Sequence, residues 1–339
     1  MQTIHYFAGG NTARGFVSCF DAILPENRRK RMYFIKGGPG VGKSTLMRRF
    51  AEAVQKKGLE VELFHCSSDP DSLDGVSVPA LGVGMMDGTA PHVYDPAVPG
   101  ARDTLISLGD FLDEKALAPH AGEIADVQRR LSACFASCYR YLAASEQLLN
   151  ALPVPEEDAQ KISDTAARLT RHLPLRGGRG SVRRLFGSAF TPKGLVEITD
   201  LSLLERRVTV EVPFGAHASG LLTRIAQTAQ ERGLDVILLL DPLIPERILH
   251  AIIPAHGLAF CTGSRQTTGE WVESGEVFAP YAADSREDDR ALGRLLHERA
   301  LEALARAKEL HDELERFYVH TMDHSRWQQV LDRLLSQLG

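Results

Sequence analysis

The 339-residue chain has no apolar run long enough to cross a membrane and contains only five cysteines. A membrane-spanning helix needs about 20 consecutive apolar residues, so we expect no contact with a membrane. The first residues also show no signal-peptide pattern. The cysteines lack zinc-ligand spacing, and Cys134 and Cys138 are one helical turn apart among apolar residues, which favours buried thiols. These absences predict a protein of the reducing cytoplasm.

The chain also lacks an excess of charge of either sign. It contains 39 basic and 44 acidic residues, for a net charge of −5. This balance gives no electrostatic reason to expect nucleic acid or an anionic surface as a partner. The length is sufficient for two domains, each with its own core.

One glycine-rich segment carries most of the functional information. Residues 37–44 read GGPGVGKS and match the phosphate-binding pattern GxxxxGK[ST] at every fixed position. The N–H groups of such a loop, and the start of the helix that follows it, bind a polyphosphate. We expect Lys43 to contact the β- and γ-phosphates and Ser44 to ligate Mg²⁺. The predicted ATP-binding residues are Gly38, Pro39, Gly40, Val41, Gly42, Lys43, Ser44 and Thr45.

The flanking residues fit this motif. Residues 32–35 form a β-prone run that enters the loop, and Leu46, Phe50 and Val54 recur at helical spacing after it. Gly58 is placed to end that helix. A strand, a loop and a helix in this order are what a phosphate-binding loop requires.

A second carboxylate-bearing segment is expected beside the loop. Residues 81–87 read as a buried strand that ends in Asp87, which we expect to orient Mg²⁺. Many P-loop ATPases have glutamate at the next position, where this chain has Gly88. The group that orients water or a substrate hydroxyl must then come from elsewhere. The candidates are Asp69 and Asp71, on a predicted acidic loop over residues 67–75, and His92; for Asp74 in the same loop, turn chemistry is favoured.

The chain repeats itself at an offset of 175 residues. The register runs without a gap from Arg31 and Arg206 to Gly88 and Gly263. The second copy has lost the groups that the chemistry needs: Val212, His217, Ala218 and Thr262 stand where the first copy has Gly37, Gly42, Lys43 and Asp87. Side chains at the glycine positions block close approach of a phosphate. The sequence therefore predicts a single working site.

These observations predict an α/β protein with two P-loop NTPase-like parallel-sheet domains in tandem, each with a helical appendage. Residues 1–175 form the predicted active domain, with its appendage at about 101–173. Residues 176–339 form the degenerate domain, with C-terminal helices at about 286–338. The apolar stripes of these helices favour packing between the domains. The Arg-rich segment 176–184 is interpreted as a solvated linker, with delivery of an arginine finger as the alternative.

Four segments resemble an uncharacterised bacterial family of tandem P-loop ATPase-like proteins. They are GGPGVGKST (37–45), HCSSDPDSLDG (65–75), DGTAPHVYDP (87–96) and LFGSAFTPKG (185–194). The resemblance extends over nearly the whole chain. It implies ATP binding and two P-loop domains, and it assigns no substrate. Relatives often keep the lysine in both loops, so the His217-Ala218-Ser219 segment of this chain departs from the family.

Three functions are compatible with these residues. The first is a cytoplasmic Mg-ATP-dependent ATPase with one site and a structural or regulatory second domain. The second is a kinase that transfers the γ-phosphoryl group to a small molecule or nucleotide, which Gly88 favours. The third is a non-catalytic ATP-sensing scaffold. A GTPase and a transporter ATPase are disfavoured, because the chain has no Asn/Thr-Lys-x-Asp motif for guanine and no LSGGQ-like signature. The sequence leaves open whether the chain forms a homo-oligomer.

Overall fold

The computed structural model describes residues 3–89, 93–263, 270–281 and 287–337. Twelve strands form one mixed sheet in the order β16-β12-β15-β14-β13-β9-β1-β5-β6-β7-β4-β8. Six of its eleven strand pairings are parallel. The predicted α/β class is confirmed, but the structure has one continuous mixed sheet where two parallel sheets were expected.

The first half of the sheet carries the glycine-rich loop. Its strands are β1 (Ile4–Phe7), β4 (Arg31–Lys36), β5 (Glu62–Cys66), β6 (Asp69–Val78), β7 (Val83–Asp87) and β8 (Asp103–Ser107). A hairpin of β2 (Gly9–Thr12) and β3 (Gly15–Ser18) follows β1, and helix α1 (Lys43–Lys56) follows β4. The apolar side chains of α1 are buried against the sheet, and Gly58, with φ of 83°, lies just after its last turn as predicted.

The second half repeats this arrangement. Its strands are β9 (Val182–Phe186), β12 (Arg206–Glu211), β13 (Val236–Leu240), β14 (Ile248–Ile253), β15 (Leu258–Gly263) and β16 (Glu270–Val272). The hairpin is β10 (Ser188–Thr191) and β11 (Gly194–Glu197), and the helix is α5 (Ser219–Glu231). Counted outward from the centre, equivalent strands occupy equivalent places in the two halves. The 175-residue offset therefore corresponds to a structural repeat.

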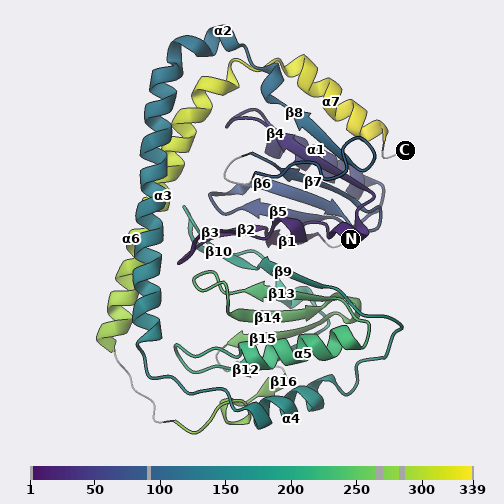
Figure 1. Ribbon diagram of the computed structural model, residues 1–339, viewed down its shortest axis with the longest axis vertical. Coiled ribbons are helices and arrows are strands. Elements are labelled where there is room, and N and C mark those ends of the chain that lie inside the picture. The colour runs from purple at the N-terminus through teal and green to yellow at the C-terminus, as the bar shows by residue number, and fades with distance from the viewer. Residues whose placement is uncertain (1–2, 90–92, 264–269, 282–286, 338–339) are drawn as a thin grey trace.

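The remaining helices lie outside the sheet. They are α2 (Glu114–Leu117), α3 (Ala121–Asn150), α4 (Ala159–Thr170), α6 (Glu287–Val319) and α7 (His324–Ser336). Helix α4 continues the first half of the chain but packs on α5, whereas α7 ends the second half and packs on α1 (Figure 1). Asp158 and Asp323 cap α4 and α7 in the same manner. Each half is therefore completed by a helix of the other.

The two longest helices pack along their length. Helices α3 and α6 run side by side past the hairpins that follow β1 and β9 (Figure 1). Val127 of α3 packs with Leu310 and Leu314 of α6, so the predicted packing role of these apolar stripes is confirmed. Cys138 is buried and Cys134 is half-buried.

A buried ion pair lies where the halves meet. Arg183 of β9 donates to both carboxylate oxygens of Glu62 on β5, at 2.8 and 2.9 Å, and the two side chains are 9% and 10% exposed. Strands β1 and β9 themselves meet at the Phe7–Phe186 pair, which is antiparallel. The cation and its partner thus link the halves across the centre of the sheet.

Candidate functional site

The glycine-rich loop connects the end of β4 to the start of α1. Gly40 and Gly42 have φ values of 70° and 84°, where residues with a side chain are strained. Within the part of the chain that the structure describes, the N–H groups of residues 40–45 donate to no protein acceptor. A run of free donors at the start of a long helix is the arrangement that binds an oxyanion.

Lys43 is held inside this loop. Its Nζ donates to the carbonyl oxygens of Gly37 at 2.6 Å and Gly38 at 2.9 Å. The same atom lies 3.5 Å from Oδ2 of Asp87, and both side chains are about 15% exposed. The structure therefore brings together the predicted phosphate-binding lysine and the predicted magnesium-orienting carboxylate.

Asp87 is positioned by the pairing of β7 with β4. The two strands are parallel, and Asp87 is the register partner of Ile35, two residues before the loop. Its Oδ1 accepts the N–H of Thr89 at 2.8 Å, and the Thr89 hydroxyl donates to Gly37 O at 3.1 Å. These bonds tie the carboxylate to the base of the loop.

Ser44 is anchored from the other side. Its Oγ accepts the N–H of Leu73, on β6, at 2.9 Å. A hydroxyl oxygen has two lone pairs and a proton, so this bond leaves one lone pair for a cation. Ser44 and Asp87 are the residues that fit Mg²⁺ here, because oxygen atoms are its preferred ligands.

The predicted acidic loop is wrong as a loop, because β6 begins at Asp69. Asp69 accepts from the Ser72 hydroxyl at 3.0 Å and lies 3.6 Å from Nζ of Lys308, on α6. Asp71 is exposed and pairs at 2.5 Å with Lys193, at the tip of the second hairpin. Both predicted candidates therefore contact cations of the second half.

For Asp74 the prediction of a turn residue is wrong. Turn chemistry was expected, but Asp74 lies within β6 and is only 6% exposed. Burial raises the pKa of Asp74 to about 7, and the negative charge of Asp87 adds to this increase. The lysine of the loop acts in the opposite direction. Asp74 is thus a buried carboxyl group in the electrostatic field of Lys43 and Asp87.

Two further predictions concern residues outside the loop. His92 lies outside the described residues, so its proposed role stays a prediction. Residues 176–179 are exposed, as the solvated-linker prediction requires, but β9 begins at Val182 and Arg183 is buried against Glu62. Arg28 contacts Ser181 and precedes β4, so the segment lies near the beginning of β4, whereas the loop follows its end. The arginine-finger alternative therefore has no support.

The C-terminal helices form a wall of the site. A Cβ at Gly40 would lie 2.9 Å from Cγ2 of Val319, at the end of α6, and one at Gly42 would lie 2.9 Å from Nε1 of Trp327, on α7. Tyr318 packs beside Gly38 in the same way. Trp327 is 8% exposed, and its indole N–H has no hydrogen-bond partner among the described residues. The first-half loop is therefore enclosed by residues of the second half.

One other group of side chains has metal-ligand chemistry. His311, Asp312 and Glu315 of α6 place ligand atoms within 4.8 Å of one another. Lys308 forms an ion pair with Asp312, so a cation of the protein already shares this group. Binding of Mg²⁺ at Ser44 and Asp87 stays a prediction.

The equivalent position in the second half is filled by protein. Oε2 of Glu157 accepts the N–H of Gly220 at 2.9 Å, and Oε1 accepts that of Leu221 at 3.0 Å. These amides correspond to those of Thr45 and Leu46 in the first half. Glu157 precedes α4 and lies outside the repeated register, so no sequence pattern predicts its role.

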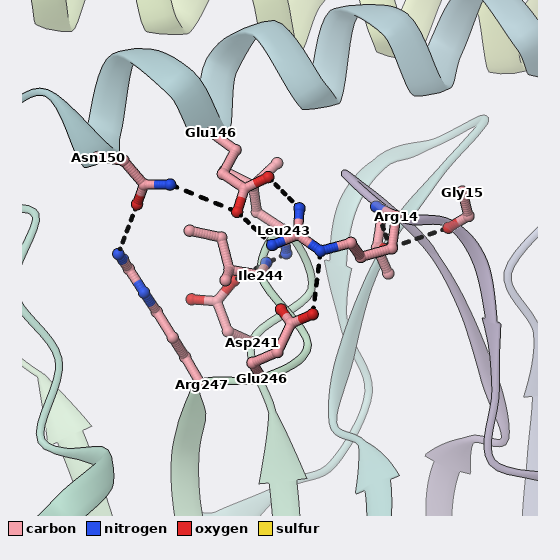
Figure 2. A network of polar contacts seen from close by, with 10 residues as sticks. Arg14, Gly15, Glu146, Asn150, Asp241, Leu243, Ile244, Glu246 and Arg247 are labelled. Carbon is pink, nitrogen blue, oxygen red and sulfur yellow. Dashed lines mark hydrogen bonds and ion pairs between the residues drawn. The ribbon is translucent and has the colours of Figure 1, made fainter.

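The segment that follows β13 is also fixed by ion pairs. Arg14, at the tip of the first hairpin, contacts Glu146 of α3 and Glu246 (Figure 2). Asn150 joins Glu146 to Arg247 in the same network. Arg14–Glu246 is the counterpart of Lys193–Asp71, so each hairpin tip supplies a cation to the other half.

Searches with this chain against protein-family models, curated proteins and solved structures returned no match. The family resemblance therefore stays a prediction. Among the described helices, even the two longest, α3 and α6, are not apolar enough to lie across a bilayer.

Proposed function

We propose that the chain is a Mg-ATP-binding P-loop NTPase that hydrolyses ATP at a single site in its first half. The free N–H groups of residues 40–45 receive the phosphates, with Lys43 adding a positive charge. Ser44 and Asp87 hold Mg²⁺, whose role is to neutralise the charge that develops on the phosphates.

The contrast between the two helix starts is the observation that carries this proposal. At α1 the N–H groups of residues 40–45 have no protein acceptor within the described chain, and that of Leu46 donates to Gly42 O, whereas at α5 the Glu157 carboxylate accepts the N–H groups of Gly220 and Leu221. The second half also lacks the lysine and the strand-end aspartate. We infer that residues 176–339 have a structural or regulatory role and that residues 1–175 carry the site.

The enclosing wall suggests how the halves are coupled. Val319 and Trp327 contact the loop glycines, and Lys308 approaches Asp69. We propose that occupation of the loop changes these contacts, so that the nucleotide state is passed to α6 and α7. Asp69 is our candidate for orienting the attacking water.

A kinase is the second candidate, and Gly88 favours it. A Cβ at this position would lie 3.0 Å from the carbonyl oxygen of Tyr94, so the site has little room for the glutamate that polarises water in many ATPases. In this reading Asp69 or Asp74 accepts the proton of a small-molecule hydroxyl group.

Turnover measurements separate these functions. Purified protein with Mg-ATP is expected to release phosphate slowly without an acceptor, and Lys43→Ala is the control for contaminating activity. ADP formation that depends on an added metabolite pool would instead identify the kinase. Saturable binding without turnover would leave an ATP-sensing scaffold. Absence of binding to any purine nucleotide with Mg²⁺ would refute the proposal.

A further inference from the structure

The start of α5 holds a carboxylate in the way that other helices hold a phosphate. Both oxygens of Glu157 are used, each by one of two consecutive N–H groups, at 2.9 and 3.0 Å. The side chain is only 16% exposed. Helix α5 has 13 residues, so the positive end of its dipole favours an anion at this point.

The surroundings are adapted to the carboxylate. A Cβ at Gly220 would lie 2.8 Å from Oε2 of Glu157, so glycine makes room for the group at the position that Thr45 holds in the first half. Nδ1 of His217 lies 3.8 Å from the same oxygen. An anion, a glycine and an imidazole thus meet at one helix start.

Glu157 is held in place by its backbone. It forms an antiparallel bridge with Phe278, and the next residue, Asp158, donates its N–H to Val277 O at 2.9 Å. Asp158 also caps α4. The carboxylate is therefore presented to α5 by a fixed segment, and little conformational entropy is lost when it binds.

The segment that precedes α7 corresponds to this one, because α7 packs on α1 as α4 packs on α5, but it has no carboxylate at the equivalent position. Met322 forms the equivalent bridge with Leu112, and Asp323 caps α7 as Asp158 caps α4. A thioether is at most a weak acceptor and carries no charge, and at the start of α1 the N–H of Leu46 donates to Gly42 O while that of Thr45 has no acceptor among the described residues. The two halves differ by one internal anion.

We propose that the start of α5 is an anion-binding site which the chain fills with its own Glu157 carboxylate, and that a phosphate-type oxyanion enters when this carboxylate is removed. Glu157 then has two effects. It closes the second half to phosphates, and it ties the connection between α3 and α4 to α5. This inference does not depend on ATP binding by the first half.

The test compares Glu157→Ala with Glu156→Ala, in the full chain with Lys43→Ala so that the first loop does not respond. Glu156 is exposed and makes no side-chain hydrogen bond among the described residues. Loss of a capping acceptor lowers the Tm of a chain of this length by roughly 1–3 °C, so we expect this decrease for Glu157→Ala only. Inorganic phosphate or pyrophosphate is then expected to recover most of the loss, compared with chloride at equal ionic strength.

Two results would overturn the proposal. One is a Glu157→Ala variant with the same Tm as the Glu156→Ala control, which would mean that the hydrogen bonds of the Glu157 carboxylate to α5 do not stabilise the fold. The other is a lowered Tm that phosphate raises no more than chloride does. If Glu157→Ala fails to fold, Glu157→Ser against Glu156→Ser decides: the short side chain leaves the two N–H groups open, and only Glu157→Ser is expected to gain Tm with phosphate.

Discussion

Ser44 and Ser219 are a matched pair of hydroxyl groups that separates nucleotide binding from folding. Ser44 Oγ accepts the N–H of Leu73 at 2.9 Å, and Ser219 Oγ accepts the N–H of Ile248 at the same distance. Only Ser44 adjoins the lysine and the predicted magnesium site. Alanine at either position therefore removes the same internal hydrogen bond, but Ser44→Ala also removes a proposed metal ligand.

The magnitudes follow from burial. Leu73 and Ile248 are 2% and 3% exposed, so each substitution leaves a buried N–H without its acceptor. This costs about 1–3 kcal/mol of unfolding free energy, equally in the two variants. A contact to a charged group contributes about 1.5–3 kcal/mol, so Ser44→Ala is expected to weaken Mg-ATP binding by about 10–100-fold.

Urea unfolding of both variants measures the shared effect, and calorimetric titration with ATP measures the difference. We expect Ser44→Ala to weaken ATP binding by this factor when Mg²⁺ is present, and by less when a chelator removes the Mg²⁺. Ser219→Ala is expected to bind as the unmodified chain does. Equal loss of affinity in both variants would refute the single-site reasoning, as would unchanged Mg-dependent binding in Ser44→Ala.

Three other predictions concern the wall of the site, the centre of the sheet and its second half. In a Trp271→Phe chain, Mg-ATP is expected to change the fluorescence of Trp327, which packs beside Gly42; calorimetric binding without such a change would contradict that placement. Glu62→Gln leaves Arg183 buried without its counter-ion and is expected to cost about 3–5 kcal/mol. Glu270→Gln, in the exposed pair with Arg206, is expected to lower the free energy of unfolding by less than about 1 kcal/mol. If urea unfolding gave similar losses for Glu62→Gln and Glu270→Gln, burial would not determine the strength of these ion pairs. Burial lowers the pKa of His250 to about 4, from 6.5, so the unfolded state binds more protons and stability falls as pH drops from 6.5 towards 4. His250→Gln is expected to remove about 2 kcal/mol of this loss at about pH 5, and an unchanged pH profile of Tm would contradict it.

The parts of the fold that the sequence predicted are those determined locally. The β-prone run before the loop and the apolar spacing after it correspond to β4 and α1. The 175-residue offset predicted equivalent strands, and β4 and β12 are found at that spacing. Local propensity and repetition are readable in a single chain.

The joining of the halves was not predictable in this way. An offset shows which segments are alike, but it does not show that β1 meets β9 or that α4 packs on α5. Like the packing of α3 against α6, these contacts join segments that are far apart in the sequence. The same limit explains why the wall formed by Trp327 was not expected.

Two carboxylates, Asp74 and Glu157, illustrate the limit for the site. Asp74 lies in a run of Asp, Ser and Gly that favours turns, but pairing of β6 with both β5 and β7 makes the run a strand. Glu157 has no local signal, because its partners are backbone amides more than 60 residues later. In both cases tertiary structure decided the role of the side chain.

The central claim is a single nucleotide site in the first half of the chain. Equilibrium dialysis of the full chain with labelled ATP and Mg²⁺ tests it most directly, because the method counts bound nucleotide. We predict a single ATP per chain at saturation and none in Lys43→Ala. Two nucleotides per chain, or one that persists in Lys43→Ala, would contradict the account.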